Sequence, residues 1–398
     1  MLFKILLKTV NNLKYSTQTI SKKDILSVSK VLKSELLTQG PTTIKFENKI
    51  KNLVGSKYAL AVNSGSSALL LACKALSLKP GDLFWTVPNS FVATANCGIL
   101  CGLKIGFVDI DNDTWNISIE KLENKLKIAK KKGKLPKLII VVHLGGLPVN
   151  PLKLKKLSRK YKFKIVEDAS HSFGGKYYSR KVGCSKWSDI TVFSFHPVKI
   201  ITTGEGGCCT TNNKQYYEKL IALRNNGIIK EKKNFKFKNL GPWYYEQHSL
   251  GYNFRMNDIQ SSLGVSQLKN LNIFLKKRNK IAQYYQNNLK NLPIKFQKIE
   301  NFFYSTYHLF IIKLDIKYKY LHKKFFNYLR SKKMYVNVHY LPIHLQPFYR
   351  KFGFKKNQFP VAEEYSETAI SIPIYPNLKK KDQIKIINYI KLFFKKYA

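Results

Sequence analysis

Short apolar runs alternate with amphipathic stretches over the first two thirds of the chain. Aliphatic and β-branched runs predict strands at 58–62, 105–110, 138–144, 164–167 and 190–195. Between several of them apolar residues recur at helical spacing, as over 118–129 and 151–160. Strands that alternate with helices form βαβ units, so an α/β domain with a mostly parallel, mixed sheet and right-handed crossovers is expected.

The last third of the chain has a different pattern, with more helix and fewer strands. It predicts helices over 258–288, 321–331 and 381–397 and strands at 307–314 and 334–338. This pattern favours a smaller α+β domain. The predicted division is an N-terminal extension over 1–14, a large domain over 15–265 and a small C-terminal domain over 266–398.

Two segments have the composition of neither domain. Residues 1–14 are apolar and basic, but they lack arginine, a long apolar core and a cleavage site. We expect a short extension, with organelle targeting as the less favoured alternative. The lysine-rich segment 229–240 is predicted to be a loop that acts as a mobile flap.

The net charge of +47 does not by itself indicate a nucleic-acid-binding protein. Only seven of the 70 basic residues are arginine, the residue that nucleic-acid sites prefer for bidentate contacts. A coding bias toward A and T explains the 63 lysines, so no nucleic-acid partner is expected. No apolar run approaches the length of a membrane span, so no membrane partner is expected either.

The six cysteines indicate a reducing compartment. They form no CxxC pair and lack the spacing of a zinc site, so no metal is expected. Reduced thiols fit a cytoplasmic enzyme best.

The strongest chemical signal is a lysine that follows a buried strand. Lys199 lies between the predicted strand at 190–195 and the glycine-rich turn 202–207. Asp168 ends the strand before it, and alternation turns the neighbouring Glu167 to the other face. A lysine that forms a Schiff base and an acid that keeps a pyridine nitrogen protonated are what pyridoxal phosphate requires. A surface lysine and a turn acid are the alternatives.

Weaker signals accompany this pair. Ser64, Gly65 and Ser66 lie between a predicted strand and a helix, where backbone N–H groups bind phosphate, although serines there also serve simply as helix caps. Phe91 has the shape to stack on a flat cofactor, and His171 to bond its phenolic oxygen. Packing and structural roles are the alternatives for both.

Three segments together resemble the DegT/DnrJ/EryC1/StrS sugar aminotransferases. They are 167–171 (Glu-Asp-Ala-Ser-His), 193–207 around Lys199, and 251–260, which begins Gly-Tyr-Asn-Phe-Arg. The resemblance covers roughly residues 15–395. It implies the type I fold of aminotransferases that depend on pyridoxal 5'-phosphate.

The resemblance also implies roles for single residues. Lys199 would bind the cofactor covalently and Asp168 would pair with its ring nitrogen, while His171 would contact the ring oxygen and Phe91 would cover the ring. The phosphate would be held by Ser64, Gly65, Ser66 and Ser194. Asn253 matches an asparagine that reaches the phosphate in the neighbouring subunit, which implies a homodimer with shared sites.

Within the family, segments 241–247 and 338–349 are most like members of the pseudaminic acid pathway. That likeness implies transfer of an amino group from glutamate to C4 of a UDP-linked 4-keto-6-deoxy-N-acetyl hexosamine. The expected substrate contacts are Tyr15, Gln18, His339 and Tyr340. One departure is Leu147, where many relatives carry a polar residue, so a dTDP- or GDP-linked keto sugar stays open as an alternative.

Three rival functions remain at the level of the sequence. Related deoxysugar dehydratases carry histidine where this chain has Lys199, so lysine favours transamination. A degenerate, non-catalytic relative is disfavoured because Asp168 and Lys199 are both present. A basic nucleic-acid-binding protein would show salt-sensitive retention on nucleic acid and no bound chromophore.

Overall fold

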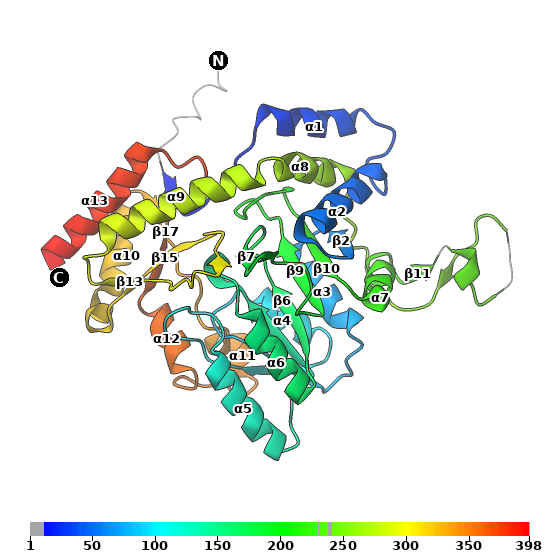
Figure 1. Ribbon diagram of the computed structural model, residues 1–398, viewed down its shortest axis with the longest axis horizontal. Helices are drawn as coiled ribbons and strands as arrows, with labels where there is room; N and C mark the ends of the chain where they lie inside the picture. The colour runs from blue at the N-terminus through cyan, green and yellow to red at the C-terminus, as the bar shows by residue number, and fades with distance from the viewer. Residues whose placement is uncertain (1–11, 230, 238–240, 398) are drawn as a thin grey trace.

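A seven-stranded sheet forms the centre of the large domain. The structure is a computed structural model that describes residues 12–229, 231–237 and 241–397. In spatial order the strands are β2 (Tyr58–Val62), β10 (Gly207–Thr211), β9 (Ile190–Ser194), β6 (Lys164–Asp168), β5 (Leu138–Val142), β3 (Leu83–Thr86) and β4 (Lys104–Phe107). Only β10 runs antiparallel to its neighbours, so the predicted mostly parallel, mixed sheet is confirmed (Figure 1).

Helices bury both faces of this sheet, which explains why its central strand β5 is apolar throughout. Leu138 and Ile140 of β5 pack with α3 (Gly65–Ala75), α4 (Ala93–Ile99) and α7 (Lys214–Arg224). On the other face, Ile139 and Val141 pack with α5 (Ile119–Lys131) and α6 (Pro151–Tyr161). The same alternation places successive side chains of each strand on opposite sides of the sheet.

The second of the two N-terminal helices covers the remaining part of the second face. Ser21 and Asp24 form a capping box at the start of α1 (Lys22–Leu32). α2 (Pro41–Val54) starts with a proline and ends at Gly55, whose φ of 75° is the left-handed conformation that glycine adopts readily. Both helices pack against α8 (Asp258–Leu268), as Figure 1 shows at the top of the molecule.

The helix predicted over 258–288 is in fact two helices. α8 ends at Leu268, and α9 (Leu271–Leu289) begins after Asn270. The prediction of one helix was wrong because no proline or glycine marks the break. The passage from the core of the large domain to that of the small domain falls within α9, because Phe274 and Leu275 still pack in the first core and Ile281 packs in the second.

A three-stranded antiparallel sheet organises the small domain. Its order is β13 (Ile294–Phe296), β15 (Phe310–Leu314) and β17 (Ala369–Ile372). The helices α9, α10 (His322–Ser331) and α13 (Lys380–Tyr397) bury their apolar faces against it. The predicted division into domains stays a prediction, because chain contacts cross the proposed boundaries in both directions.

Two segments make these crossings, one near the N-terminus and one after β16. β1 (Leu13–Lys14) pairs in parallel with β16 (Met334–Tyr335), so the strand predicted at 334–338 is shorter than expected and lies outside the small antiparallel sheet. After β16 the chain returns to the large domain, where Ile343 and Tyr349 pack on Phe107. This return contains α11 (Pro347–Arg350) and α12 (Pro360–Ser366).

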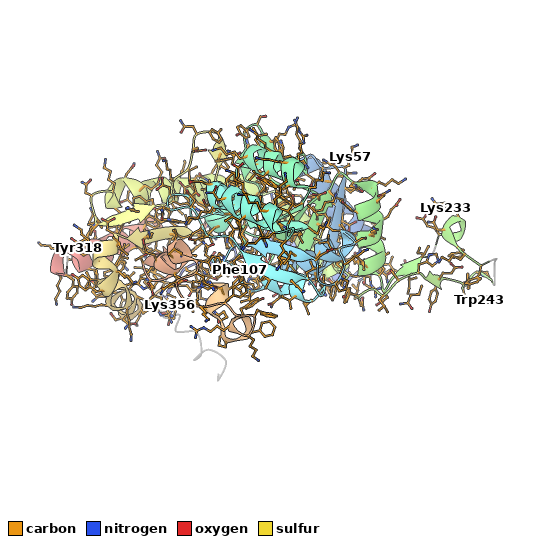
Figure 2. The ribbon with its side chains drawn as sticks, turned by 90° about the horizontal axis from the view of Figure 1, so that it is seen from below. Lys57, Phe107, Lys233, Trp243, Tyr318 and Lys356 are labelled. Atoms are coloured by element: carbon orange, nitrogen blue, oxygen red, sulfur yellow. The ribbon has the colours of Figure 1, made fainter. Side chains whose placement is uncertain are left out.

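The described part of the lysine-rich segment lies in a projection from the large domain. β11 (Ile228–Ile229) pairs with β12 (Glu246–Gln247), and Figures 1 and 2 show the described residues between them, 231–237 and 241–245, extending away from the body, with Lys233 and Trp243 among them. A smaller sheet joins β14 (Phe303–Tyr304), β7 (Lys176–Tyr177) and β8 (Arg180–Lys181). Among the described residues no helix is both long and apolar enough to cross a membrane. The predicted extension over 1–14 lies mostly outside the described residues.

Candidate active site

A cavity of about 590 Å³ lies at the carboxyl ends of the central parallel strands. Open α/β sheets bind their ligands at this edge. Lys199 and Asp168 both line the cavity, together with Ser194 at the end of β9 and Val142 at the end of β5. The structure therefore brings together the two residues that the sequence singled out.

The amine of Lys199 has a lowered pKa. It lies in the turn after β9 and is partly exposed to the cavity. Removal from bulk water lowers the pKa of its amine from 10.5 to about 8, and the negative charge of Asp168 opposes this shift. A substantial fraction of the Lys199 amine is therefore neutral near pH 8.

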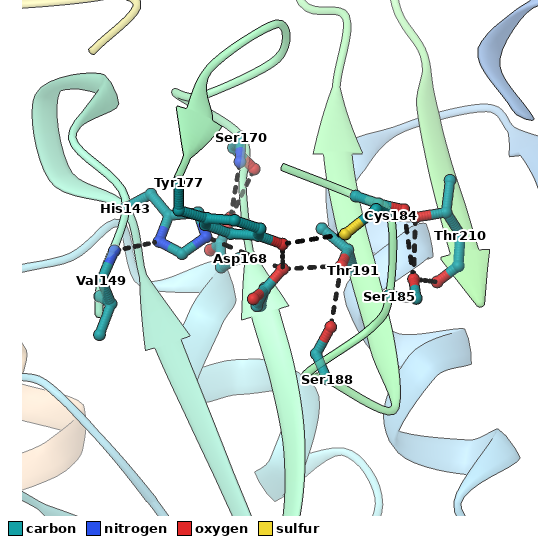
Figure 3. A network of polar contacts seen from close by, with 12 residues as sticks. His143, Val149, Asp168, Ser170, Tyr177, Cys184, Ser185, Ser188, Thr191 and Thr210 are labelled. Carbon is teal, nitrogen blue, oxygen red and sulfur yellow. Dashed lines mark hydrogen bonds and ion pairs between the residues drawn. The ribbon is translucent and has the colours of Figure 1, made fainter. Parts of the chain in front are cut away.

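Asp168 is buried at the end of β6 and is held from two sides. Its Oδ2 accepts a hydrogen bond of 2.7 Å from the Thr94 hydroxyl. Its Oδ1 accepts from the backbone N–H and the hydroxyl of Ser170, the hydroxyl at 2.6 Å (Figure 3). These contacts fix the carboxylate in the cavity wall.

The neighbouring Glu167 belongs to a separate network on the other side of β6. It accepts hydrogen bonds from the hydroxyls of Thr191, at 2.8 Å, and Tyr177, at 3.5 Å. Figure 3 shows Tyr177, Thr191 and Ser188 within this network. The predicted separation of the two acids by strand alternation is confirmed.

The start of α3 forms another wall of the cavity. Ser64 caps the helix by accepting from the backbone N–H of Ser67 at 3.1 Å, so its hydroxyl has the structural role that the sequence left open. A Cβ atom on Gly65 would lie 2.8 Å from Ser194 Cβ, so only glycine allows this close approach. Ser66 is exposed at the helix N-terminus, where N–H groups and the helix dipole favour an anion.

Aromatic and imidazole rings close the opposite side. Phe91 is 57% exposed and lines the cavity, with its ring 6.3 Å from that of Tyr340. The Tyr340 hydroxyl lies 3.2 Å from Nε2 of the buried His171. His339 also lines the cavity, and its Nδ1 lies 2.9 Å from the Ser371 hydroxyl.

The histidines of this wall are held neutral. Burial lowers the pKa of His171 well below its usual value, and the nearby positive charge of Lys199 adds to this effect. The same two causes lower the pKa of His339 to about 3. Burial raises the pKa of Tyr340, so its hydroxyl keeps its proton. A neutral imidazole and a protonated phenol are therefore available as hydrogen-bonding groups.

Tyr15 lines the active-site cavity, with its ring 5.0 Å from that of His339. Three other residues that the sequence singled out, Gln18, Asn253 and Leu147, lie outside this cavity. Gln18 lines two neighbouring cavities. Asn253 is exposed on the chain after the projection and pairs with Asn225. Leu147 is 1% exposed and packed in the interior, so a polar residue lost there does not line this cavity.

Sequence reasoning missed several residues that shape the site. Thr94 and Ser170 hold Asp168, and His308 packs behind His171 with the ring centroids 4.4 Å apart. Ser170 stands two residues from Asp168, which is a local signal for a hydroxyl that bonds a carboxylate. Thr94 and His308 reach the site only through the tertiary fold, so no sequence pattern marks them.

The residues of the cavity fit pyridoxal phosphate. The fixed carboxylate suits its ring nitrogen, and the lysine with a lowered pKa suits its carbonyl. The helix N-terminus suits its phosphate. His171 supports this fit because its buried Nδ1 has no hydrogen-bond partner among the described residues. The exposed ring of Phe91 adds a flat apolar surface.

Comparisons with known proteins agree with this geometry. Residues 18–391 match the DegT/DnrJ/EryC1/StrS aminotransferase family. The UDP-4-amino-4,6-dideoxy-N-acetyl-beta-L-altrosamine transaminase of Campylobacter jejuni is 36% identical over 371 residues, covering 93% of this chain and 94% of that protein.

Solved structures give the same result. Helicobacter pylori PseC, an aminotransferase involved in the biosynthesis of pseudoaminic acid, superposes with a TM-score of 0.88 at 32% identity, covering 97% of this chain and all of that one. The PLP-form of the putative sugar aminotransferase Spr1654 of Streptococcus pneumoniae has a TM-score of 0.87 at 26% identity, covering 97% and 100% of the two chains.

Proposed function

Since the chain belongs to the DegT/DnrJ/EryC1/StrS aminotransferase family and is a sugar aminotransferase, we propose that it aminates C4 of a UDP-linked 4-keto-6-deoxy-N-acetyl hexosamine, with glutamate as the donor. One observation carries this proposal. A single cavity joins Lys199, Asp168 and the start of α3 at the carboxyl edge of the sheet.

Pyridoxal phosphate is the proposed cofactor. Lys199 would bind it covalently, and the negative charge of Asp168 would keep its pyridine nitrogen protonated. Ser66, Ser194 and the first N–H groups of α3 would bind its phosphate, while Phe91 would cover its ring. His171 would bond its phenolic oxygen. When bound, this cofactor supplies an electron sink that makes the α-proton of an amino acid acidic.

Lys199 is the group that moves protons. With its pKa near 8, the amine is both a competent base and, once protonated, a competent acid at neutral to mildly alkaline pH. Once the amine of glutamate has taken its place on the cofactor, the freed Lys199 amine would accept the α-proton of glutamate, and in the sugar half of the reaction it would deliver a proton to C4 of the sugar. Asp168 raises the pKa of Lys199 and so keeps a protonated fraction available.

The substrate side of the cavity is formed by Tyr15, His339 and Tyr340. All three line the same wall, and the tyrosine rings offer both an apolar face and a hydroxyl. His339 is neutral because of its lowered pKa, so it would act as a hydrogen-bonding group rather than as a cation toward the diphosphate. Similarity to the altrosamine transaminase and to PseC supports a UDP-linked sugar over a dTDP- or GDP-linked one.

We further propose that the enzyme works in the cytoplasm as a homodimer that shares its sites. The six cysteines are free thiols, as a reducing compartment requires. Asn253 is exposed in the single chain and lies outside the cavity wall, so a phosphate contact through Asn253 requires a second subunit.

The test of this function offers glutamate with three keto sugars, linked to UDP, dTDP or GDP. Mass spectrometry should find the 4-amino product mainly from the UDP sugar. Preference for another nucleotide would overturn the substrate assignment and leave the transaminase intact. No amination of any of the three would overturn the proposal itself.

A further inference from the structure

Three of the six cysteines lie together between α3 and α4. Cys73 is on α3, Cys97 is on α4, and Cys101 lies in the turn that follows α4. All three pack in the hydrophobic cluster on the face of the sheet that these helices cover. None of them lines the active-site cavity, so the proposed reaction does not use these thiols.

Cys73 contacts both of the other thiols. Its Sγ lies 3.5 Å from Cys97 Sγ, and its thiol also donates a hydrogen bond to Cys101. Cys97 in turn donates to the backbone carbonyl of Thr94 at 3.3 Å. Cys73 is 1% exposed and Cys97 is 2% exposed, so neither of these two thiols is open to a reagent in solution.

Cys101 differs from its two neighbours because it is partly exposed. The hydrogen bond from Cys73 lowers the pKa of the Cys101 thiol, burial opposes this shift, and the positive charge of Lys74 adds to it. Hydrogen bonding to Cys101 and Cys97, followed by burial, raises the pKa of Cys73 well above its usual value. Since the thiolate is the form that peroxides oxidise, Cys101 is the reactive thiol of the three.

Clustered thiols commonly bind a metal ion or take part in redox chemistry. The described residues contain no group of three or more His, Cys, Asp or Glu side chains with the geometry of a metal site. An accessible thiol of lowered pKa next to a second thiol is instead the arrangement of redox sensors. In the reducing compartment proposed above, a disulfide between such thiols is transient.

We propose that Cys101 is a site of oxidation by peroxides and that it then forms a reversible disulfide with Cys73. The Cys101 thiolate attacks a peroxide oxygen, the O–O bond breaks, and the hydroxide or alkoxide that leaves takes up the thiol proton. Cys101 is now a sulfenic acid. The Cys73 thiol attacks its sulfur, the S–O bond breaks, and the hydroxyl group leaves with the Cys73 proton as water. The two thiols together lose two electrons, which the peroxide accepts.

The first step prepares the second. The hydrogen bond to Cys101 is the largest cause of the raised pKa of Cys73, and oxidation of Cys101 removes this cause. Cys73 therefore becomes more reactive when Cys101 is a sulfenic acid. Exchange with two molecules of a small thiol, which are themselves oxidised to a disulfide, restores both cysteines.

The disulfide acts on the active site through α4. An S–S bond is about 2.05 Å long, so bond formation draws Cys101 and the end of α4 toward α3. α4 has only seven residues, and its Thr94 holds the Asp168 carboxylate. Oxidation should therefore lower kcat, and reduction should restore it.

The first test treats the holoenzyme with hydrogen peroxide, blocks the remaining thiols and maps the linked tryptic peptides by mass spectrometry. The proposal expects a link between Cys73 and Cys101 that dithiothreitol removes. Cys97 and Cys101 fall in the same tryptic peptide, since no lysine or arginine separates them, so fragmentation of the linked pair must distinguish them. A link through Cys97, or no link to Cys73, would overturn the proposal. This mapping does not depend on the proposed sugar amination.

Two matched variants locate the reactive thiol. Cys101→Ser should abolish the link and slow the loss of activity in peroxide by about tenfold. Cys184→Ser removes a buried thiol that packs in a different cluster, and it should keep both the link and the sensitivity. Equal sensitivity of the two variants would count against Cys101.

A third variant tests the role of Cys73. In Cys73→Ser the oxidised Cys101 lacks its partner, so it should proceed to the sulfinic acid, which dithiothreitol does not reduce. Activity lost in peroxide should then return on reduction in the native enzyme but not in this variant. A Cys73–Cys101 disulfide that leaves kcat unchanged would overturn the coupling to Asp168.

Discussion

Thr94 and Asp168 are joined by a hydrogen bond of 2.7 Å, although they are 74 residues apart in the chain. Thr94 lies on α4, just after Phe91, and Asp168 ends β6. The helix that follows the proposed ring-covering aromatic therefore also holds the acid proposed for the ring nitrogen. The two contacts to the cofactor are coupled through one short helix.

Replacement of Thr94 by valine tests this coupling. Hydrogen bonds to charged groups contribute about 1.5–3 kcal/mol. Without the Thr94 hydroxyl, the Asp168 carboxylate should lose part of this stabilisation and with it part of its fixed orientation. We expect Thr94→Val to lower kcat by about tenfold, whereas Thr94→Ser keeps the hydroxyl and most of the rate. Equal rates in both variants and the native enzyme would show that Asp168 does not need this bond.

Asp168→Asn should leave the cofactor bound but remove the charge that protonates its ring. We expect a loss of about 100-fold or more in kcat and a shifted visible absorbance band. Glu167→Gln is the matched control, since Glu167 faces the other network behind the strand. A change in the absorbance of the control but not of Asp168→Asn would reverse the assignment of the two acids.

The lowered pKa of Lys199 predicts selective labelling in the cofactor-free protein. Because the pKa is about 8 rather than 10.5, an amine-acylating reagent should modify Lys199 with a midpoint near pH 8 and the surface lysines only near pH 10. Asp168→Asn should move the midpoint lower, since the lost negative charge favoured the ammonium form. Peptide mapping across a pH series measures both values.

The lowered pKa of Lys199 also determines how the stability of the cofactor-free fold changes with pH. Between about pH 8 and 10.5 the unfolded chain holds the Lys199 proton more tightly than the folded chain does. Lowering the pH through this window therefore destabilises the cofactor-free fold at this residue. Lys199→Met should abolish this part of the pH dependence in denaturation curves.

Shared active sites predict recovery of activity in mixed dimers. Lys199→Ala chains and Asn253→Ala chains should each be inactive or nearly so. Mixed dimers place one native Lys199 and one native Asn253 in the same site, so part of the activity should return. If heterodimers form and stay inactive, Asn253 does not complete a site on the partner chain.

Much of the fold could be predicted because several strands are short runs of mostly aliphatic and aromatic residues. β5 and β9 were found this way, but β3 and β10 were not. β10 is Gly-Cys-Cys-Thr-Thr, a sequence with low strand signal that is stabilised by pairing on both sides. The break between α8 and α9 likewise could not be predicted, because neither proline nor glycine marks it.

The candidate site, like the fold, could be predicted from the sequence only in part. Lys199, Asp168 and Ser64 could be found because each stands where a strand ends, and strand ends gather at one edge of a parallel sheet. Thr94 and His308 could not be found, since they reach the site from α4 and from the chain before β15.

The most direct test of the account is reduction of the purified holoenzyme with borohydride, followed by peptide mapping. The account predicts a yellow protein whose cofactor becomes fixed to the peptide that contains Lys199, and no fixation in Lys199→Ala. Fixation at any other lysine, or none at Lys199 in a protein that carries the chromophore, would contradict it.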